Sequence, residues 1–132
     1  MILLTPALRE RLLANGRIRG IDHVPVVRFF NPLGAGTWHA TELGEDGDTL
    51  FGLADLGFGC PELSLVELQA IRLAFGLGIE RDLLFIGRFP LSTYAEAARL
   101  AGSIPDGERL LEAAGNGHER DGPCPGEGEG EG

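Results

Sequence analysis

The sequence predicts an α+β domain in which an antiparallel β-meander of three to four strands carries helices packed on one face. Three observations predict this class. Strand-like runs in the first half are separated by short turn clusters, helical apolar spacing appears at the N-terminus and in the second half, and no glycine fingerprint follows a strand. The 132 residues suffice for one core but not for two ordinary domains.

The first predicted element is a helix that begins after Thr5. A threonine in this position accepts a hydrogen bond from a free backbone N–H of the first turn, and Pro6 fits the first helical position. The apolar stripe of this helix consists of Leu8, Leu12 and Leu13. We expect the helix to end at Asn15 and Gly16, because a left-handed residue costs little there.

Three strands follow the helix, and each is rich in branched or aromatic residues. They are expected at residues 24–30, 37–43 and 49–56, with turn clusters at 31–36 and 44–48. Connections this short join antiparallel neighbours, so the three strands form a meander.

The second turn sets the register of the last two strands. Direct pairing across it places Thr37 opposite Asp55 and Glu42 opposite Leu50. At ~3.3 Å per residue, Glu42 and Asp55 then lie about 16 Å apart. These two carboxylates cannot share one metal ion unless a bulge at Gly52 changes the spacing.

Capping boxes open two further predicted helices. Ser64 with Glu67 begins one, and Thr93 with Glu96 begins a short alanine-rich one. The apolar run at 82–89 lies between them, and we expect it to be the fourth strand.

The domain is predicted to span residues 1–101, and residues 102–132 are predicted to be an acidic, largely disordered tail. Residues 106–114 are expected to add at most one or two loosely attached helical turns. The alternation of Gly and Glu that ends the chain cannot bury enough apolar surface to fold.

The chain is acidic, and its charge is unevenly distributed. It has 20 Asp and Glu against 11 Arg, no Lys, and a net charge of −9, which argues against a generally basic nucleic-acid binder. Residues 1–28 contain five arginines, whereas residues 29–67 contain seven acids and no Arg or Lys. No apolar run approaches the ~18 residues that span a bilayer, and no signal-peptide pattern is present. We therefore expect a cytoplasmic protein without a membrane partner.

Carboxylates crowd the middle of the chain, at Glu42, Glu45, Asp46, Asp48, Asp55 and Glu62. Such a group could hold Mg²⁺ or Mn²⁺ for phosphoryl transfer, or it could be a solvated acidic turn. Cys60 and Cys124 lack CxxC spacing, which predicts neither a disulfide framework nor a zinc knuckle. We favour the acidic turn and expect no metal and no cofactor.

The same register puts Thr37, His39 and Asp55 on one face of the sheet. A carboxylate beside His39 could make it a general base, or could merely fix a side chain by a hydrogen bond. Trp38 and Phe51 fall on opposite faces. If helices cover only one face, one of these two aromatic side chains is exposed or lies beneath the tail or a partner.

Several short motifs occur in a fixed order: Phe30-Asn-Pro, Gly36-Thr-Trp38, Thr41-Glu-Leu43, Phe51-Gly-Leu-Ala-Asp-Leu-Gly57, Pro61-Glu-Leu63 and Glu80-Arg-Asp-Leu83. Over residues 1 to about 101 the chain resembles the small bacterial family called domain of unknown function 2958. The resemblance implies an accessory protein of a plasmid, conjugative element or phage-like region, and it supplies no catalytic residues.

We therefore expect a binding module that acts through a protein partner more than through nucleic acid, and that has no catalytic residue. The residues expected to bind are Trp38, His39, Glu42, Asp55, Glu62, Arg17 and Arg19. One alternative is a metal-dependent enzyme acting on nucleic acid or nucleotide. Another is an antirestriction-type inhibitor that presents the acidic residues 42–62 to a DNA-binding protein.

Overall fold

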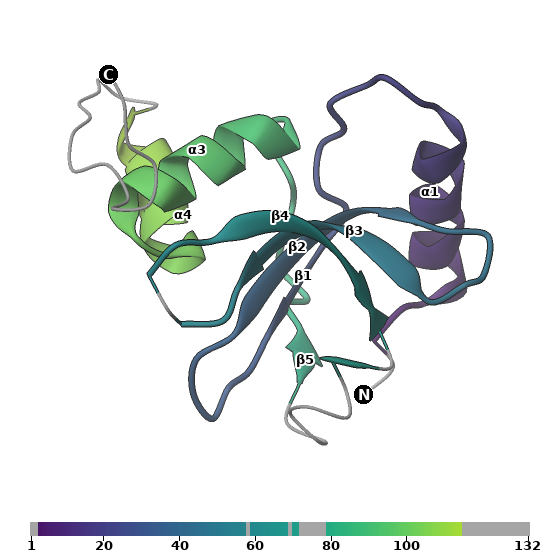
Figure 1. The fold of residues 1–132 in the computed structure, drawn as a ribbon, viewed down its shortest axis with the longest axis horizontal. Coiled ribbons are helices and arrows are strands. Elements are labelled where there is room, and N and C mark those ends of the chain that lie inside the picture. Colours follow the sequence, from purple (N-terminus) through teal and green to yellow (C-terminus); the bar gives the residue numbers. More distant parts are fainter. Residues whose placement is uncertain (1–2, 58, 69, 72–78, 115–132) are drawn as a thin grey trace.

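The computed structural model describes residues 3–57, 59–68, 70–71 and 79–114, and Figure 1 shows its fold. The elements are α1 (Pro6–Arg17), β1 (Val27–Phe30), β2 (Thr37–Leu43), β3 (Thr49–Asp55), β4 (Glu62–Glu67), β5 (Glu80–Arg81), α3 (Leu91–Ala101) and α4 (Ile104–Ala114). An antiparallel sheet with helices confirms the predicted α+β class. Among the described residues the sheet has five strands, one more than the largest number predicted.

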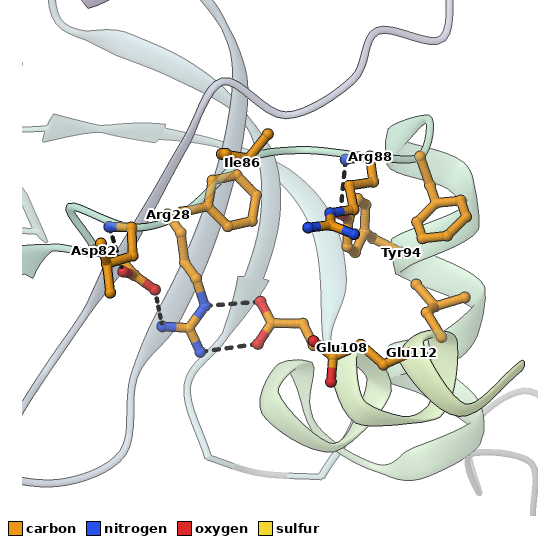
Figure 2. Close-up of a pocket in the computed structure, with 11 residues that line it drawn as sticks. Arg28, Asp82, Ile86, Arg88, Tyr94, Glu108 and Glu112 are labelled. Carbon is orange, nitrogen blue, oxygen red and sulfur yellow. Dashed lines mark hydrogen bonds and ion pairs between the residues drawn. The ribbon is translucent and has the colours of Figure 1, made fainter. Parts of the chain in front are cut away.

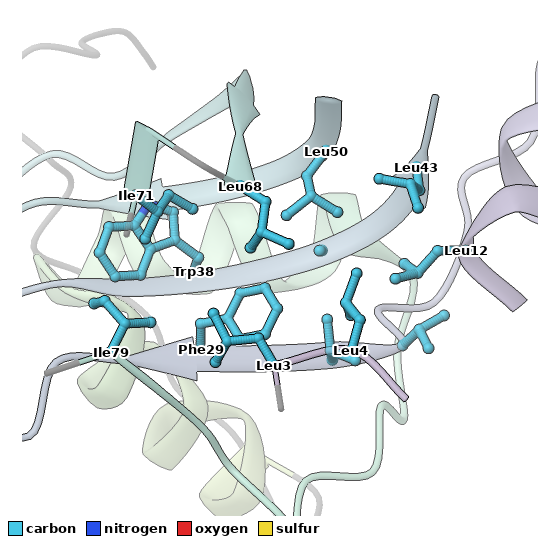
Figure 3. Packing of buried hydrophobic residues seen from close by; sticks show 13 residues of the cluster. Leu3, Leu4, Leu12, Phe29, Trp38, Leu43, Leu50, Leu68, Ile71 and Ile79 are labelled. Atoms are coloured by element: carbon cyan, nitrogen blue, oxygen red, sulfur yellow. The ribbon is translucent and has the colours of Figure 1, made fainter. Parts of the chain in front are cut away.

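The strand order is β4-β3-β2-β1-β5, and every neighbouring pair is antiparallel. The first four strands form the predicted meander. β5 lies beside β1, so the chain returns from one edge of the sheet to the other between Glu67 and Glu80. Leu68, Ile71 and Ile79 of this connection are buried against the sheet (Figure 3).

The predicted register of β2 and β3 is confirmed in one half and wrong in the other. Thr37 pairs with Asp55, as predicted, but a bulge between Ala40 and Glu42 shifts the remaining pairs by one residue. Glu42 consequently lies opposite Phe51 instead of Leu50. Gly52 faces this bulge, and a Cβ atom there would overlap the carbonyl group of His39. The bulge thus requires glycine on the neighbouring strand.

Both faces of the sheet are covered, so the expectation of helices on one face is wrong. Leu12 of α1 belongs to the buried cluster of Trp38 and Phe29 (Figure 3), whereas Tyr94 of α3 belongs to the cluster of Leu53 on the other face. Trp38 and Phe51 do lie on opposite faces. Because both faces are covered, Trp38 is buried and Phe51 is half-buried, so neither is the exposed aromatic side chain that one covered face would leave.

The start of α1 is confirmed and its predicted end is wrong. The hydroxyl of Thr5 accepts a hydrogen bond from the backbone N–H of Leu8 at 3.2 Å. The helix continues through Gly16 to Arg17, and a Cβ atom on Gly16 would lie 2.8 Å from the carbonyl oxygen of Leu43. Gly16 therefore allows α1 to approach β2 closely and does not form a left-handed cap.

Two elements predicted in the second half differ from the structure, a helix at its start and a strand in its position. Ser64 and Glu67 belong to β4, whose six residues all pair with β3, so strand pairing outweighs the local capping box. Residues 68, 70 and 71 are helical, and the rest of that predicted helix lies outside the described residues. The strand lies at Glu80–Arg81 and not at 82–89, which form an irregular loop.

α3 begins at Leu91, two residues before the predicted cap at Thr93. The carboxylate of Asp22 accepts a hydrogen bond from the backbone N–H of Ser92 at 3.1 Å, which provides a cap from a distant part of the chain. No helix in the described part of the chain is long and apolar enough to cross a membrane.

The predicted domain boundary at residue 101 is wrong because α4 is part of the folded core. Ile104 is buried in the same cluster as Leu53 and Tyr94. Gly107 lies so close to α3 that a Cβ atom there would be 2.6 Å from the backbone nitrogen of Ala98. Helices in such close contact are well docked. The remainder of the predicted tail, residues 115–132, lies outside the described residues.

Candidate functional site

A cavity of about 330 Å³ opens between β1, the 82–89 loop, α3 and α4 (Figure 2). Its charged lining residues are Arg28, Asp82, Arg88, Glu108 and Glu112. Its apolar and aromatic lining residues are Leu84, Phe85, Ile86, Phe89, Tyr94 and Leu111. A concave surface with apolar walls and a few convergent polar groups is typical of a binding site.

The carboxylate of Glu108, on α4, is held at the base of this cavity by two strands. The Nε and Nη2 atoms of Arg28 on β1 donate to it at 2.7 and 3.0 Å, and the Nε2 atom of His39 on β2 donates at 2.6 Å (Figure 2 shows the Arg28 bonds). The Nη1 atom of Arg28 also lies 3.6 Å from Asp82. This network, which we call the Glu108 clamp (Glu108, Arg28 and His39), fastens α4 to the sheet.

His39 is fully buried between aromatic rings. Its ring stacks on Phe85 at a centroid distance of 5.3 Å and meets the edge of Tyr94 at 4.7 Å. Burial lowers the pKa of His39 below its ordinary value, although Glu108 acts to raise it. A neutral ring that donates Nε2–H to Glu108 leaves Nδ1 as the acceptor, and Nδ1 has no hydrogen-bond partner among the described residues.

Glu108 is ionised within the clamp. Burial acts to raise its pKa, but the hydrogen bonds from His39 and Arg28 together with the charge of Arg28 outweigh burial, so the pKa lies below the ordinary value. A carboxylate whose oxygens already accept three hydrogen bonds is a weak general base. The geometry therefore suits a structural role for Glu108 and leaves the rim of the cavity for binding.

The rim carries an exposed apolar loop. The side chains of Leu84 and Ile86 are 89 % and 71 % exposed, and Leu83 beside them is exposed as well. Phe85, between Leu84 and Ile86, points inward onto His39. Because residues 82–89 were predicted to be a strand, this site was not expected. The sequence feature that indicates it is an apolar run with neither the helical nor the strand period.

The apolar loop is anchored at both ends. The backbone N–H of Asp82 donates to the carbonyl oxygen of Arg28 on β1 at 2.9 Å, and the backbone N–H of Arg88 donates to the hydroxyl of Tyr94 on α3 at 3.1 Å (Figure 2 shows the Arg88 bond). Gly87 lies against the backbone of Pro25, where no larger residue fits. The aliphatic side chains are therefore presented from a fixed backbone.

The predicted pairing of His39 with Asp55 does not occur, although both side chains lie on the predicted face. Asp55 is buried and accepts hydrogen bonds at 2.9 Å from the backbone N–H groups of Ile104 and Gly57. It therefore connects β3 to the start of α4, while His39 contacts Glu108. Trp38 lies in the core on the other face and cannot form a surface.

The predicted acidic and basic groups are in contact with each other. Arg17 donates to Glu45 at 2.7 Å, so the arginine-rich and the acidic regions of the sequence partly neutralise each other. Asp46 accepts hydrogen bonds from Thr49 and Asp48 of its own turn, which lowers its pKa to about 2.

The other three predicted binding residues lie near β4. Glu42 and Arg19 line a second cavity beside this strand, and Glu62 lies on β4 itself.

The six carboxylates do not converge on one point. Asp55 is covered by α4, Glu45 pairs with Arg17 and Asp46 closes its own turn. In the part of the chain that the structure describes, no three His, Cys, Asp or Glu side chains are placed to hold a metal ion.

The fold and the site define a small α+β protein in which a polar clamp holds a C-terminal helix pair on a five-stranded antiparallel sheet. The family model described as protein of unknown function DUF2958 matches residues 3–105, and the chain belongs to this family. The match ends just inside α4, three residues before Glu108. No curated protein and no solved structure matches the chain.

The clamp predicts a pH dependence of stability. The pKa of His39 is lower in the folded than in the unfolded protein, so acidification protonates the unfolded state first and favours it. Between pH 7.5 and 5.5 the free energy of unfolding should fall by at most about 1.4 kcal/mol per pH unit for this one group. Urea titrations at several pH values measure this slope.

A matched pair of variants isolates His39. His39→Gln keeps an N–H donor for Glu108 but does not titrate, so its unfolding free energy should change less over this pH range. His23→Gln, on a loop away from the clamp, should keep the wild-type slope. An unchanged slope in His39→Gln would show that another group causes the pH dependence.

Proposed function

We propose that this protein is a non-catalytic binding module that recognises a protein partner through the 330 Å³ cavity and its apolar loop, Leu83–Ile86. The observation that carries the proposal is the exposure of aliphatic side chains beside a cavity, on a loop with an anchored backbone. Contiguous exposed apolar surface with a polar rim is typical of interaction sites in soluble proteins.

The charges around the cavity favour a protein over a nucleic acid. Three acids and two arginines line it, and Arg28 is already neutralised by Glu108 and Asp82. Nucleic-acid affinity depends on several cations that each neutralise a phosphate, and this surface offers only Arg88 for that purpose among the described lining residues. An apolar segment of a protein fits the aromatic walls, with Arg88 and Glu112 available to orient it.

The family resemblance supports placing this module among the accessory proteins of plasmids, conjugative elements or phage-like regions, and that context is part of the proposal. The metal-dependent enzyme is the weaker alternative. Its carboxylates would have to converge, whereas Asp55 is engaged with α4 and Glu42 lies beyond the bulge of β2.

Capture from a lysate of the native host tests the proposal with the tagged full chain. A partner retained by the wild type should be lost from the double variant Leu84→Glu/Ile86→Glu, because two carboxylates would be buried in an apolar contact. Leu33→Glu is the matched control, since Leu33 is also exposed but lies on the β1–β2 loop. Retention by the double variant, or loss of the partner after nuclease treatment, would contradict the proposal.

A further inference from the structure

Within the described residues, β4 forms one edge of the sheet and presents an unpaired backbone edge. It pairs with β3 on one side, and the described residues place no strand on its other side. Alternate residues of a strand direct their N–H and C=O groups to opposite sides, so half of the backbone groups of β4 face outward. Such an edge is a template for a further strand, and proteins commonly shield it.

The middle of β4 is apolar and open. Leu63 and Leu65 are 44 % and 70 % exposed, and they share the face of Phe51, which pairs with Leu65. Beside Leu65 lies a second cavity, of about 230 Å³, whose lining includes Phe51, Glu42 and Arg19. A long Arg or Lys side chain from an added strand can pack its methylene groups against Phe51 and Leu65 and place its positive charge near Glu42.

The ends of β4 are acidic. Glu62 and Glu67 are exposed, and neither has a cation at ion-pair distance among the described residues. The chain has no Arg or Lys from residue 29 to residue 67, so no neighbouring segment of this part neutralises them. A strand that approaches β4 therefore meets two leucines between two glutamates.

We infer that β4 is a docking edge for an extended segment of a basic protein partner, which adds to the sheet as a sixth strand. Apolar residues of the partner lie opposite Leu63 and Leu65, and Arg or Lys residues lie opposite Glu62 and Glu67. This surface is independent of the Leu83–Ile86 loop, because β4 and β5 are opposite edges of the sheet.

A second copy of the chain brings no positive charge to this edge. Residues paired across two strands point to the same face, so two symmetric copies would pair Ser64 with Ser64 or Leu65 with Leu65, and neither arrangement places a cation opposite Glu62 or Glu67. A basic strand places a cation opposite each glutamate, so charge complementarity favours a basic partner strand.

Two synthetic peptides test this inference on the full chain. One has the core Arg-Thr-Val-Thr-Val-Arg, and the matched control has Glu in place of both Arg residues. We expect the Arg peptide to bind about tenfold more tightly than the control by fluorescence anisotropy, with the difference shrinking as salt increases. The double variant Glu62→Lys/Glu67→Lys should reverse the preference, and Leu84→Glu/Ile86→Glu should leave it unchanged.

Amide hydrogen exchange of the wild type provides a readout that does not depend on any variant. Peptide binding should slow the exchange of backbone N–H groups within Glu62–Glu67 and not within the 82–89 loop. Equal affinity for the two peptides, or protection confined to that loop, would overturn the inference. Sedimentation that shows a dimer of the free chain, lost in Leu65→Glu, would assign the edge to a second copy and overturn it as well.

Discussion

Replacement of Glu108 by alanine is expected to lower the free energy of unfolding by about 2–3 kcal/mol, because it leaves Arg28 and His39 without their shared acceptor. Both partners are largely or fully buried, so water cannot replace the lost carboxylate efficiently. The loss should also loosen α4, which the clamp fastens to β1 and β2. Urea unfolding at pH 7.5 measures the first effect, and amide exchange in α4 measures the second.

Glu112→Ala is the control for this prediction. Glu112 lies one turn further along α4 and is exposed, and no ion pair joins it to another described residue. Its replacement should change stability by less than about 0.5 kcal/mol. Similar stabilities of the two variants would show that the Glu108 clamp does not hold α4.

The second large effect is expected at Gly52. A Cβ atom on this residue overlaps the backbone of His39 at the β2 bulge, so Gly52→Ala must displace one strand from the other. We expect a loss of about 3 kcal/mol, at the upper end of the cost of overpacking. Because the displaced segment carries His39, the Glu108 clamp should weaken at the same time and the pH dependence of stability should decrease.

Gly34→Ala is the matched substitution. Its new methyl group would have only the side-chain nitrogen of Asn31 nearby, at 3.8 Å, which is an ordinary contact. Its stability should remain within about 0.5 kcal/mol of the wild type. If Gly52→Ala were equally mild, the bulge would not depend on glycine.

Elements specified by local signals could be predicted from the sequence. The cap at Thr5 begins α1, and turn residues around Gly44 and Gly47 delimit β2 and β3. These signals act within a few residues of the chain, so no tertiary contact is needed to interpret them. The pairing of Thr37 with Asp55 followed from the same turn.

Elements specified by tertiary contacts were predicted wrongly. The Ser64 capping box is a sound local signal, but pairing of six residues with β3 gains more than a helix cap. At the bulge, the choice of Thr41 as the extra residue depends on the close fit of Gly52 against the next strand. Neither the pairing with β3 nor the fit of Gly52 can be inferred from the spacing of residues along the chain.

The candidate site was only half predictable. The sequence placed His39 and Asp55 on one face correctly, but their partners come from α4, in a segment that composition alone assigned to a disordered tail. His39 and Glu108 are 69 residues apart in the chain, and no periodicity connects them. Residues 104–114 have the apolar periodicity of a helix. This pattern indicates that the domain extends to the end of α4.

The most direct test of the proposed function is the dissociation constant of a purified partner for three forms of the full chain. We expect Leu84→Glu/Ile86→Glu to weaken binding by at least about tenfold, or about 1.4 kcal/mol, with an unchanged melting temperature. Leu33→Glu should bind like the wild type. Equal affinities for all three forms would contradict the assignment of the Leu83–Ile86 loop as the binding surface.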